Sequence, residues 1–158
     1  MKIENEFNYI ILTNNLENKI LDNFKQYLII KDVNNFDELI KIISEYNGQR
    51  IVFYGLLDQF KFDDQKYIFN LMNLKKIKYI NITPDIEKII QGDYIYVCNG
   101  CEVILEGNKE KILQEEKILN QHGFGIPFIV ELSSKLKLYN VIDKIYYDVK
   151  ELVNDLWI

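Results

Sequence analysis

Apolar residues in the first two thirds of the chain form short runs that alternate with segments of helical spacing. The runs are rich in β-branched and aromatic residues, which predicts strands, at residues 8–13, 26–31, 50–55, 78–83 and 93–98. Between them, residues 36–46 and 63–74 place apolar side chains at helical spacing, and residues 84–90 predict a short helix whose first turn begins at Pro84. Strands that alternate with helices predict an α/β sheet.

A hairpin signal follows this pattern. Asn99-Gly100 lies between two β-rich runs and predicts that residues 93–98 pair with residues 101–107. Cys98 and Cys101 flank this turn and would face each other across the strands. A C-x-x-C pair can also be a redox centre or half of a zinc site, but a structural zinc needs four ligands and a redox pair sits at the start of a helix. We expect two ordinary strand cysteines.

Beyond Gly107 the chain has helical spacing almost to its end. Three segments carry this spacing: residues 109–123, 127–139 and 148–157. Pro127 opens the second segment, and Asp148 with Glu151 forms a capping pair for the third. His122, the only histidine, precedes Gly123 at a helix end and is expected to be a simple end-of-helix cation. The pattern divides the chain into an α/β core, residues 1–107, and a helical extension, residues 108–158.

Composition and charge exclude several classes of protein. The 48% apolar share is that of a folded globular protein, and no apolar run approaches the length of a membrane span. The net charge of −5 argues against a general nucleic-acid binder, which needs a basic surface to displace counterions from phosphates. The first residues lack a basic region followed by a long apolar run, so we expect a cytoplasmic protein.

Residues 27–43 predict a strand, a polar turn and a helix, which is the topology of a phosphate-binding loop. The turn lacks the chemistry of such a loop, because there is no glycine between residues 31 and 47 and no lysine at the helix start. Asp37 and Glu38 sit at that helix start instead, where they stabilise the helix dipole and would repel a polyphosphate. We expect this anion position to be filled by the protein's own side chains.

The order of these segments resembles the ATPase subunits of ABC transporters of the energy-coupling-factor or cobalt-uptake type. "ITPDIEKIIQGDYIYVCNGCEVILEGNKEKIL" is similar to that family's switch-histidine segment "ITHDMEEA", its "NxG" hairpin and its "xEG" helix. "KILNQHGFGIPFIVELSSKLK" and "DVKELVNDL" resemble its C-terminal extension, "LLKxxGLDxPFVTELAxxLK" followed by "xxEELVxxL". The resemblance is best over residues 78–158 and implies a reduced P-loop NTPase-like sheet with flanking helices and a small helical extension.

The N-terminal part resembles the same family more weakly. "MKIENEFNY" is similar to "IKIENLxFxY", which implies that Tyr9 stacks on adenine. Residues 27–43, laid without gaps on "AIIGPNGSGKSTLLKLI", place Phe36 at the phosphate-gripping lysine and Asp37 and Glu38 at the hydroxyl residues.

Other motifs of the family are replaced as well. Pro84 stands at the switch histidine, and "VFYGLLDQFKFDD" on "ILILDEPTSGLDP" places Leu56 and Leu57 at the catalytic Asp-Glu pair. Asp63 then falls on the aspartate of the following loop. No intact "LSGGQ" signature is present, and the chain is too short for the helical subdomain that carries it. Because phosphoryl transfer relies on the loop lysine and on magnesium, these replacements imply that the catalytic machinery is lost.

These observations lead to a hypothesis of a catalytically silent relative of these ATPases. We expect no bound ATP or magnesium beyond vestigial contacts at Tyr9 and Asp63, and an interaction or regulatory role exercised through the C-terminal helices. The expected partner is a second copy of the chain or an intact ABC ATPase, with peripheral association with a membrane transport subunit. Two alternatives remain: an ATP-binding subunit of an uptake transporter whose motifs have drifted, and a gene remnant without a selected function.

The expected interface lies on apolar rows of the last two predicted helices. More apolar surface is present there than the core can cover, which is typical of an interface. The residues that we expect in this interface are Phe128, Ile129, Leu132, Leu136, Leu152 and Val153. The alternative is that these side chains complete an intramolecular core.

Overall fold

A six-stranded sheet forms the centre of the computed structural model, which describes residues 1–157. The strands follow the order β2-β3-β4-β1-β5-β6, and all pair in parallel except β6, which runs antiparallel to β5. Their bounds are β1 Tyr9–Thr13, β2 Leu28–Ile30, β3 Arg50–Tyr54, β4 Lys78–Thr83, β5 Tyr94–Asn99 and β6 Glu102–Gly107. The expected α/β sheet with flanking helices, of the ABC-ATPase-like kind, is confirmed.

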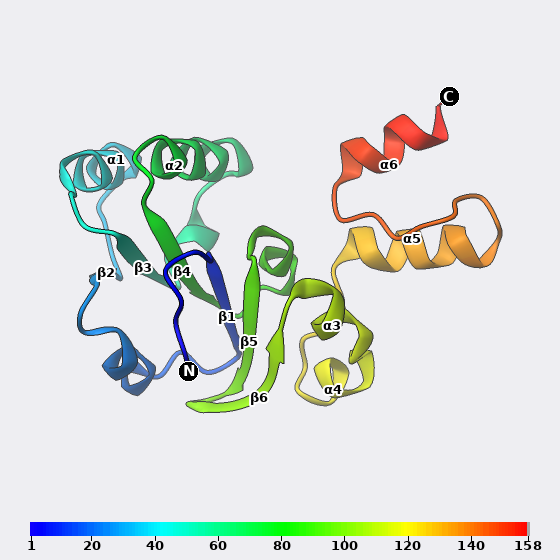
Figure 1. The fold of residues 1–158 in the computed structure, drawn as a ribbon, viewed down its shortest axis with the longest axis horizontal. Helices are drawn as coiled ribbons and strands as arrows, with labels where there is room; N and C mark the ends of the chain where they lie inside the picture. Colours follow the sequence, from blue (N-terminus) through cyan, green and yellow to red (C-terminus); the bar gives the residue numbers. More distant parts are fainter. Residues whose placement is uncertain (158) are drawn as a thin grey trace.

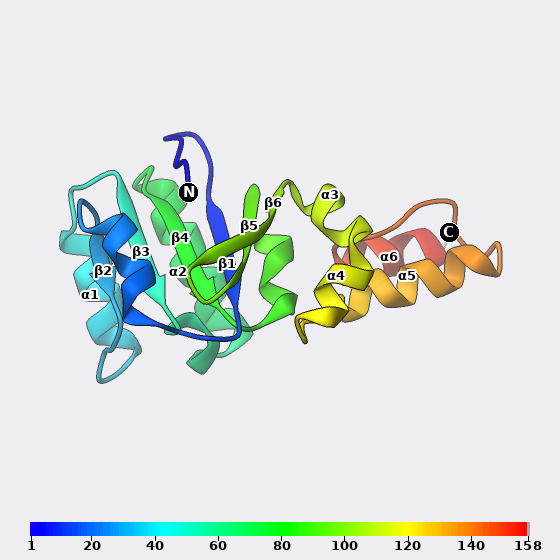
Figure 2. The same cartoon turned by 90° about the horizontal axis from the view of Figure 1, so that it is seen from below.

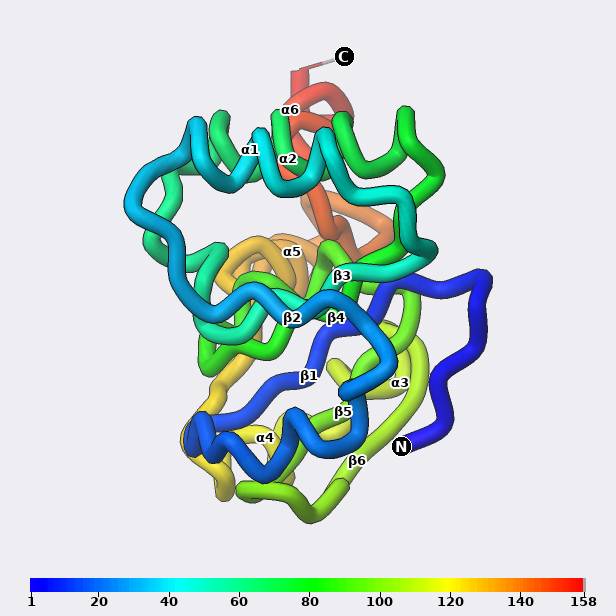
Figure 3. The backbone as a smooth tube through the Cα atoms, turned by 90° about the vertical axis from the view of Figure 1, so that its left-hand side faces the viewer, coloured from blue at the N-terminus to red at the C-terminus, as the bar shows by residue number. Residues whose placement is uncertain are grey.

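Helices cover the two faces of this sheet unequally. One face carries α1 (Phe36–Glu45) and α2 (Phe62–Leu74), as Figures 1 and 3 show. The short helix η3 (Ile86–Gln91) packs in the same apolar cluster. The other face carries the short helix η1 (Asn18–Phe24) and the N-terminal segment, residues 1–8. Alternation along the strands explains this layering, because successive side chains of a strand point to opposite faces. In β1, Ile10 packs under α1 and α2, whereas Ile11 packs under η1.

The hairpin expected at Asn99-Gly100 is present. Gly100 has a φ of +59°, a left-handed conformation that glycine adopts without steric cost. In the register of the two strands, Cys98 is opposite Val103, because a bulge shifts the pairing after Val97. The expectation that Cys98 faces Cys101 across the strands is therefore wrong.

Residues 109–123, expected as one helix, form two. α3 (Lys109–Gln114) and α4 (Glu116–Gln121) are separated by Glu115, whose ψ of 40° is not helical. Residues 84–90 also differ from expectation, since Pro84 precedes the helix and Asp85 caps η3 with an accepted hydrogen bond from the Glu87 N–H.

The last helices, α5 (Phe128–Leu138) and α6 (Val149–Leu156), form a body of their own at one end of the molecule (Figures 1 and 2). They enclose a separate apolar cluster that includes Ile129, Ile142 and Leu152. Ile112 of α3, Leu119 of α4 and Phe124, which follows α4, pack instead with the cluster under α1 and α2. By packing, the separate apolar cluster begins near Pro127, while a domain boundary at residue 107 stays a prediction. Residues 127–157 are called the tail below.

Candidate functional site at the carboxyl edge of the sheet

The carboxyl ends of β1 and β4 form the switch point of the sheet. The chain leaves β1 toward the face covered by η1, whereas it leaves the adjacent β4 toward the face covered by α1 and α2. In open parallel sheets, ligands bind in the crevice where neighbouring strands lead to opposite faces. The loops that follow β1, β3 and β4 are therefore the candidate site.

The loop after β1 takes the place of a phosphate-binding loop. Such loops have the pattern G-x-x-x-x-G-K-[ST] after a strand, and residues 13–20 are Thr-Asn-Asn-Leu-Glu-Asn-Lys-Ile. Lys19 stands at the position of the lysine in this pattern. Thr13 and Asn18 replace its two glycines, and Ile20 replaces its serine or threonine. The expected register, with Phe36 at the lysine position, is wrong because β2 lies at the edge of the sheet and pairs only with β3. The distance from the end of the first strand to Lys19 is the signal that could have identified this lysine.

Two contacts tie this loop to neighbouring segments, while residues 14–19 remain exposed. A Cβ atom added to Gly55 would lie 3.0 Å from the Leu16 side chain, so Leu16 occupies the space above the end of β3. The Asn14 side-chain amide donates to the carbonyl of His122 at 2.5 Å, which ties the loop to the end of α4. These two contacts connect the loop to the end of β3 and to the end of α4.

A negative charge lies in the same loop. Glu17 precedes the first residue of η1 and accepts a hydrogen bond from the Asn15 side-chain amide at 2.5 Å. Burial, followed by the charge of Glu17, raises the pKa of the Tyr54 phenol at the end of β3. A carboxylate at this position disfavours a polyphosphate, which needs N–H groups and cations around it.

The loops after β3 and β4 contact each other through one hydrogen bond. The Thr83 hydroxyl donates to Asp58 Oδ2 at 2.6 Å and accepts from the Asp85 N–H at 3.0 Å. Asp58 is a carboxylate at the switch point that the sequence comparison missed, because that comparison placed Leu56 and Leu57 at the acidic positions. Both leucines are fully buried in the apolar cluster, so they supply packing at this loop.

The start of α1 is saturated with internal hydrogen bonds. Glu38 Oε2 accepts from the Asn34 N–H at 2.6 Å and from the Asn34 side chain at 2.8 Å, and Asn35 Oδ1 accepts from the Glu38 N–H at 2.9 Å. Asp37 lies in the same first turn. Phe36 meets two aromatic rings edge-on and is a packing residue. The expectation that side chains fill this helix start is confirmed.

Tyr9, Asp63 and Pro84 lie in different parts of the structure. Tyr9 is 1% exposed at the amino end of β1, on the opposite edge of the sheet from the switch point, and its ring stacks on Tyr96. This position gives a purine no access to the Tyr9 ring. Asp63 is exposed in the first turn of α2. Pro84 is exposed directly after β4 at the switch point, where it offers no group for proton transfer.

The residues expected in an interface divide into two groups. The apolar cluster of the tail contains four of them: Ile129, Leu132, Leu136 and Leu152. Ile129 and Leu152 are buried inside the tail, and their place in an interface stays a prediction. Phe128 and Val153 are exposed.

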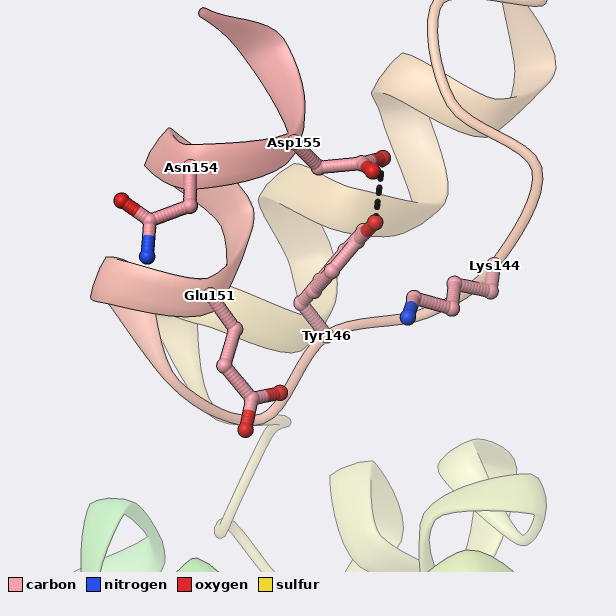
Figure 4. A pocket seen from close by; sticks show the side chains of 5 residues that line it. All are labelled: Lys144, Tyr146, Glu151, Asn154 and Asp155. Atoms are coloured by element: carbon pink, nitrogen blue, oxygen red, sulfur yellow. Dashed lines mark hydrogen bonds between the residues drawn. The ribbon is translucent and has the colours of Figure 1, made fainter. Parts of the chain in front are cut away.

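A polar hollow lies in the tail (Figure 4). Its volume is about 370 Å³, and its lining consists of Lys144, Tyr146, Glu151, Asn154 and Asp155. The Tyr146 hydroxyl donates to Asp155 Oδ2, and this bond, followed by burial, raises the pKa of Tyr146 to about 12. Lys144 Nζ lies 4.8 Å from the centre of the Tyr146 ring. Within the described residues, no group of three or more His, Cys, Asp or Glu side chains is placed to hold a metal ion.

Comparison with known proteins places these observations in context. Over 84 residues the chain is 32% identical to an energy-coupling factor transporter ATP-binding protein of Geobacillus kaustophilus, which covers 52% of this chain and 30% of the relative. It is 37% identical over 60 residues to the protein of the same name in Listeria monocytogenes. This alignment covers 38% of this chain and 22% of the relative. A third match, to the protein of the same name in Mesomycoplasma hyopneumoniae, is 32% identical over 97 residues. It covers 61% of this chain and 34% of the relative.

The aligned residues span about a third or less of the length of these relatives. No family model matches the chain. Sequence similarity over part of its length, together with a mostly parallel sheet, makes the chain an ABC-ATPase-like protein that resembles the ATP-binding proteins of energy-coupling factor transporters.

Proposed function

We propose that this protein does not hydrolyse ATP and acts as an interaction subunit through its tail. Loss of catalysis is supported by the loop after β1, which has no glycine and carries Glu17, and by the two buried leucines after β3. Lys19 supplies one cation in this loop. Phosphoryl transfer requires several groups, including magnesium, that together neutralise the charge of the phosphates.

The observation that carries the interaction role is the exposed apolar surface of the tail. Its members are Phe128, Leu138, Tyr139, Val141, Val149, Val153, Leu156 and Trp157. Phe128 is 63% exposed and Trp157 84%. Many exposed apolar side chains on one small body support an interaction surface.

Helix α6 explains how this surface arises. Val149, Leu152, Val153 and Leu156 lie along one stripe, since they are three or four residues apart. Of these, only Leu152 is buried in the tail. A helix of eight residues is too short to be stable alone in water, so we infer that burial of the remaining stripe by a partner stabilises it.

The proposed partner is a second copy of the chain, and the heterologous alternative is an intact ABC ATPase. The matched relatives are named as ATP-binding proteins of transporters, which supports a place beside such a transporter at the inner face of a membrane. No helix among residues 1–157 is long and apolar enough to cross a bilayer.

The test is the molar mass of the full chain in solution. Light scattering coupled to size exclusion should show a dimer, and Val153→Asp or Phe128→Asp should weaken dimerisation by about tenfold or more, because a charge would be buried in the interface. Leu74→Asp is the matched control, since Leu74 is as exposed but lies on α2. A monomer at every concentration would contradict the homodimer and leave the intact ATPase as the partner to be tested.

A further inference from the structure

A hollow lies at the amino edge of the sheet, far from the switch point. Its volume is about 270 Å³, at the small end of ligand pockets. The lining combines aromatic rings with charged side chains: Lys2, Glu4, Phe7, Tyr9, Tyr94, Tyr96 and Glu106. Nothing in the proposed interaction role uses these residues.

Four aromatic rings form one wall of this hollow. Tyr94 lies 5.3 Å from Tyr96 and 5.8 Å from Tyr9, between ring centres, and Phe7 lies 6.3 Å from Tyr94. The three tyrosines project from β1 and β5 to the same face of the sheet, because Tyr9 is opposite Tyr94 and Tyr96 is two residues further along β5. Tyr9 and Tyr96 are buried against each other, and Arg50 lies over the Tyr9 ring, so Phe7 and Tyr94 provide the accessible rings. The face of an aromatic ring carries partial negative charge, which attracts cations.

The N-terminal segment forms the opposite wall and is held by hydrogen bonds. The Tyr9 hydroxyl accepts from the Glu4 N–H at 2.8 Å, and the Tyr96 hydroxyl donates to the Lys2 carbonyl at 2.6 Å. The guanidinium of Arg50 donates to the Glu4 carbonyl at 2.8 Å. These bonds connect the segment to β1, β3 and β5, so the hollow has two fixed walls.

The charge balance of the lining is negative. Lys2 Nζ pairs with Glu4 at 2.9 Å. Glu106 is opposite Tyr96 in the register of β5 and β6, and no Lys or Arg of the described residues forms an ion pair with it. Burial, followed by the Glu106 charge, raises the pKa of Tyr94. One carboxylate without a counter-ion therefore faces the aromatic wall.

We propose that this hollow binds a small organic monocation with an apolar headgroup, of the quaternary-ammonium class. Aromatic faces favour such ions over strongly hydrated metal cations, because little hydration is lost on binding. The Glu106 carboxylate supplies the compensating charge at the rim. A free quaternary amine and the headgroup of a choline lipid share this chemistry; the small size of the hollow favours the free amine.

The experiment is a nuclear magnetic resonance titration of the full chain with choline chloride, at constant ionic strength. The control ligand is the neutral isostere of choline, in which carbon replaces the quaternary nitrogen. Choline should shift amide signals of β5 and β6 and saturate in the millimolar range, whereas the isostere should not. Phosphatidylcholine vesicles, tested by sedimentation, distinguish a lipid headgroup from the free amine.

Two variants locate the site. Tyr94→Leu and Glu106→Gln should each weaken choline binding by about two- to fivefold. Glu102→Gln is the matched control, because Glu102 pairs with Asn99 and points to the other face of the hairpin. Glu106 is exposed, so its substitution leaves the fold intact. Equal binding of choline and its isostere, no binding of either, equal effects of Glu106→Gln and Glu102→Gln, or binding to vesicles without binding of free choline would each overturn the proposal.

Discussion

Arg50 shows how one residue organises the amino edge of the sheet. It is the only arginine in the sequence, it is 2% exposed, and burial lowers its pKa. No carboxylate pairs with it in residues 1–157; its guanidinium donates to the carbonyls of Glu4 and Phe7 and stacks on Tyr9. The planar fork of arginine suits two carbonyls at once, whereas an ammonium does not.

Arg50→Lys should therefore lower the free energy of unfolding by about 2 kcal/mol, because at least one charge-assisted hydrogen bond is lost from a buried site. Urea denaturation followed by circular dichroism measures this change. Lys41→Met, on the exposed side of α1, is the control and should change stability by less than about 0.5 kcal/mol. Equal effects of the two substitutions would show that the Arg50 hydrogen bonds do not stabilise the fold.

The two cysteines should differ in reactivity. Cys98 is buried, and burial raises the pKa of its thiol to about 11, so the reactive thiolate stays scarce until the pH rises well above the ordinary value. Cys101 is partly exposed at the turn. Iodoacetamide at mildly alkaline pH should label the folded chain once, at Cys101, as read by mass spectrometry. Labelling of both thiols at equal rates would contradict the buried position of Cys98.

At the scale of elements, local sequence predicted most strands and helix ends. The run "KYINIT" is β4 in full, and Asp148 caps α6 by accepting from the Lys150 and Glu151 N–H groups. Strand order was out of reach, because it depends on pairing between distant segments such as Tyr9 with Ile80. That order decides which loop lies at the switch point, which is why Lys19 was missed and Phe36 was misplaced.

The cap of α6 can be tested directly. Asp148→Ala should destabilise this helix by about 1 kcal/mol, since two N–H groups lose their acceptor. Amide hydrogen exchange should then be faster in α6 and unchanged in the strands. Asp143→Ala is the control, because Asp143 is exposed and outside any helix. Unchanged exchange in α6 would mean that the side-chain cap contributes nothing measurable.

For the whole molecule, packing predicts where the chain can be divided. Residues 1–126 retain Ile112, Leu119 and Phe124 in the main cluster and should form a folded monomer. Residues 1–107 lose these three side chains and should be less stable by several kcal/mol, at about 2 kcal/mol or more for each large apolar group removed. Thermal unfolding and light scattering compare the two. A dimer of residues 1–126 would place the interface in the α/β core.

The composition of the loop after β1 predicts weak nucleotide binding by the whole chain. Calorimetric titration with Mg-ATP should give a dissociation constant weaker than the low-micromolar range, because a single lysine without glycine N–H groups cannot enclose a triphosphate. Lys19→Gln should change any residual affinity, whereas Lys31→Gln, after β2, should not. Tight binding that depends on Lys19 would favour a drifted ATP-binding subunit over a silent one.

The central position of β1 has a consequence for how the chain folds. Both of its neighbours come much later in the sequence, since Tyr9 pairs with Ile80 and Tyr94. During synthesis β1 emerges well before either partner, so its apolar run has no hydrogen-bonded neighbour until β4 (Lys78–Thr83) has been made. Pairing between such distant segments slows folding, and until it occurs the unpaired edges of β1 can associate with other unfolded chains.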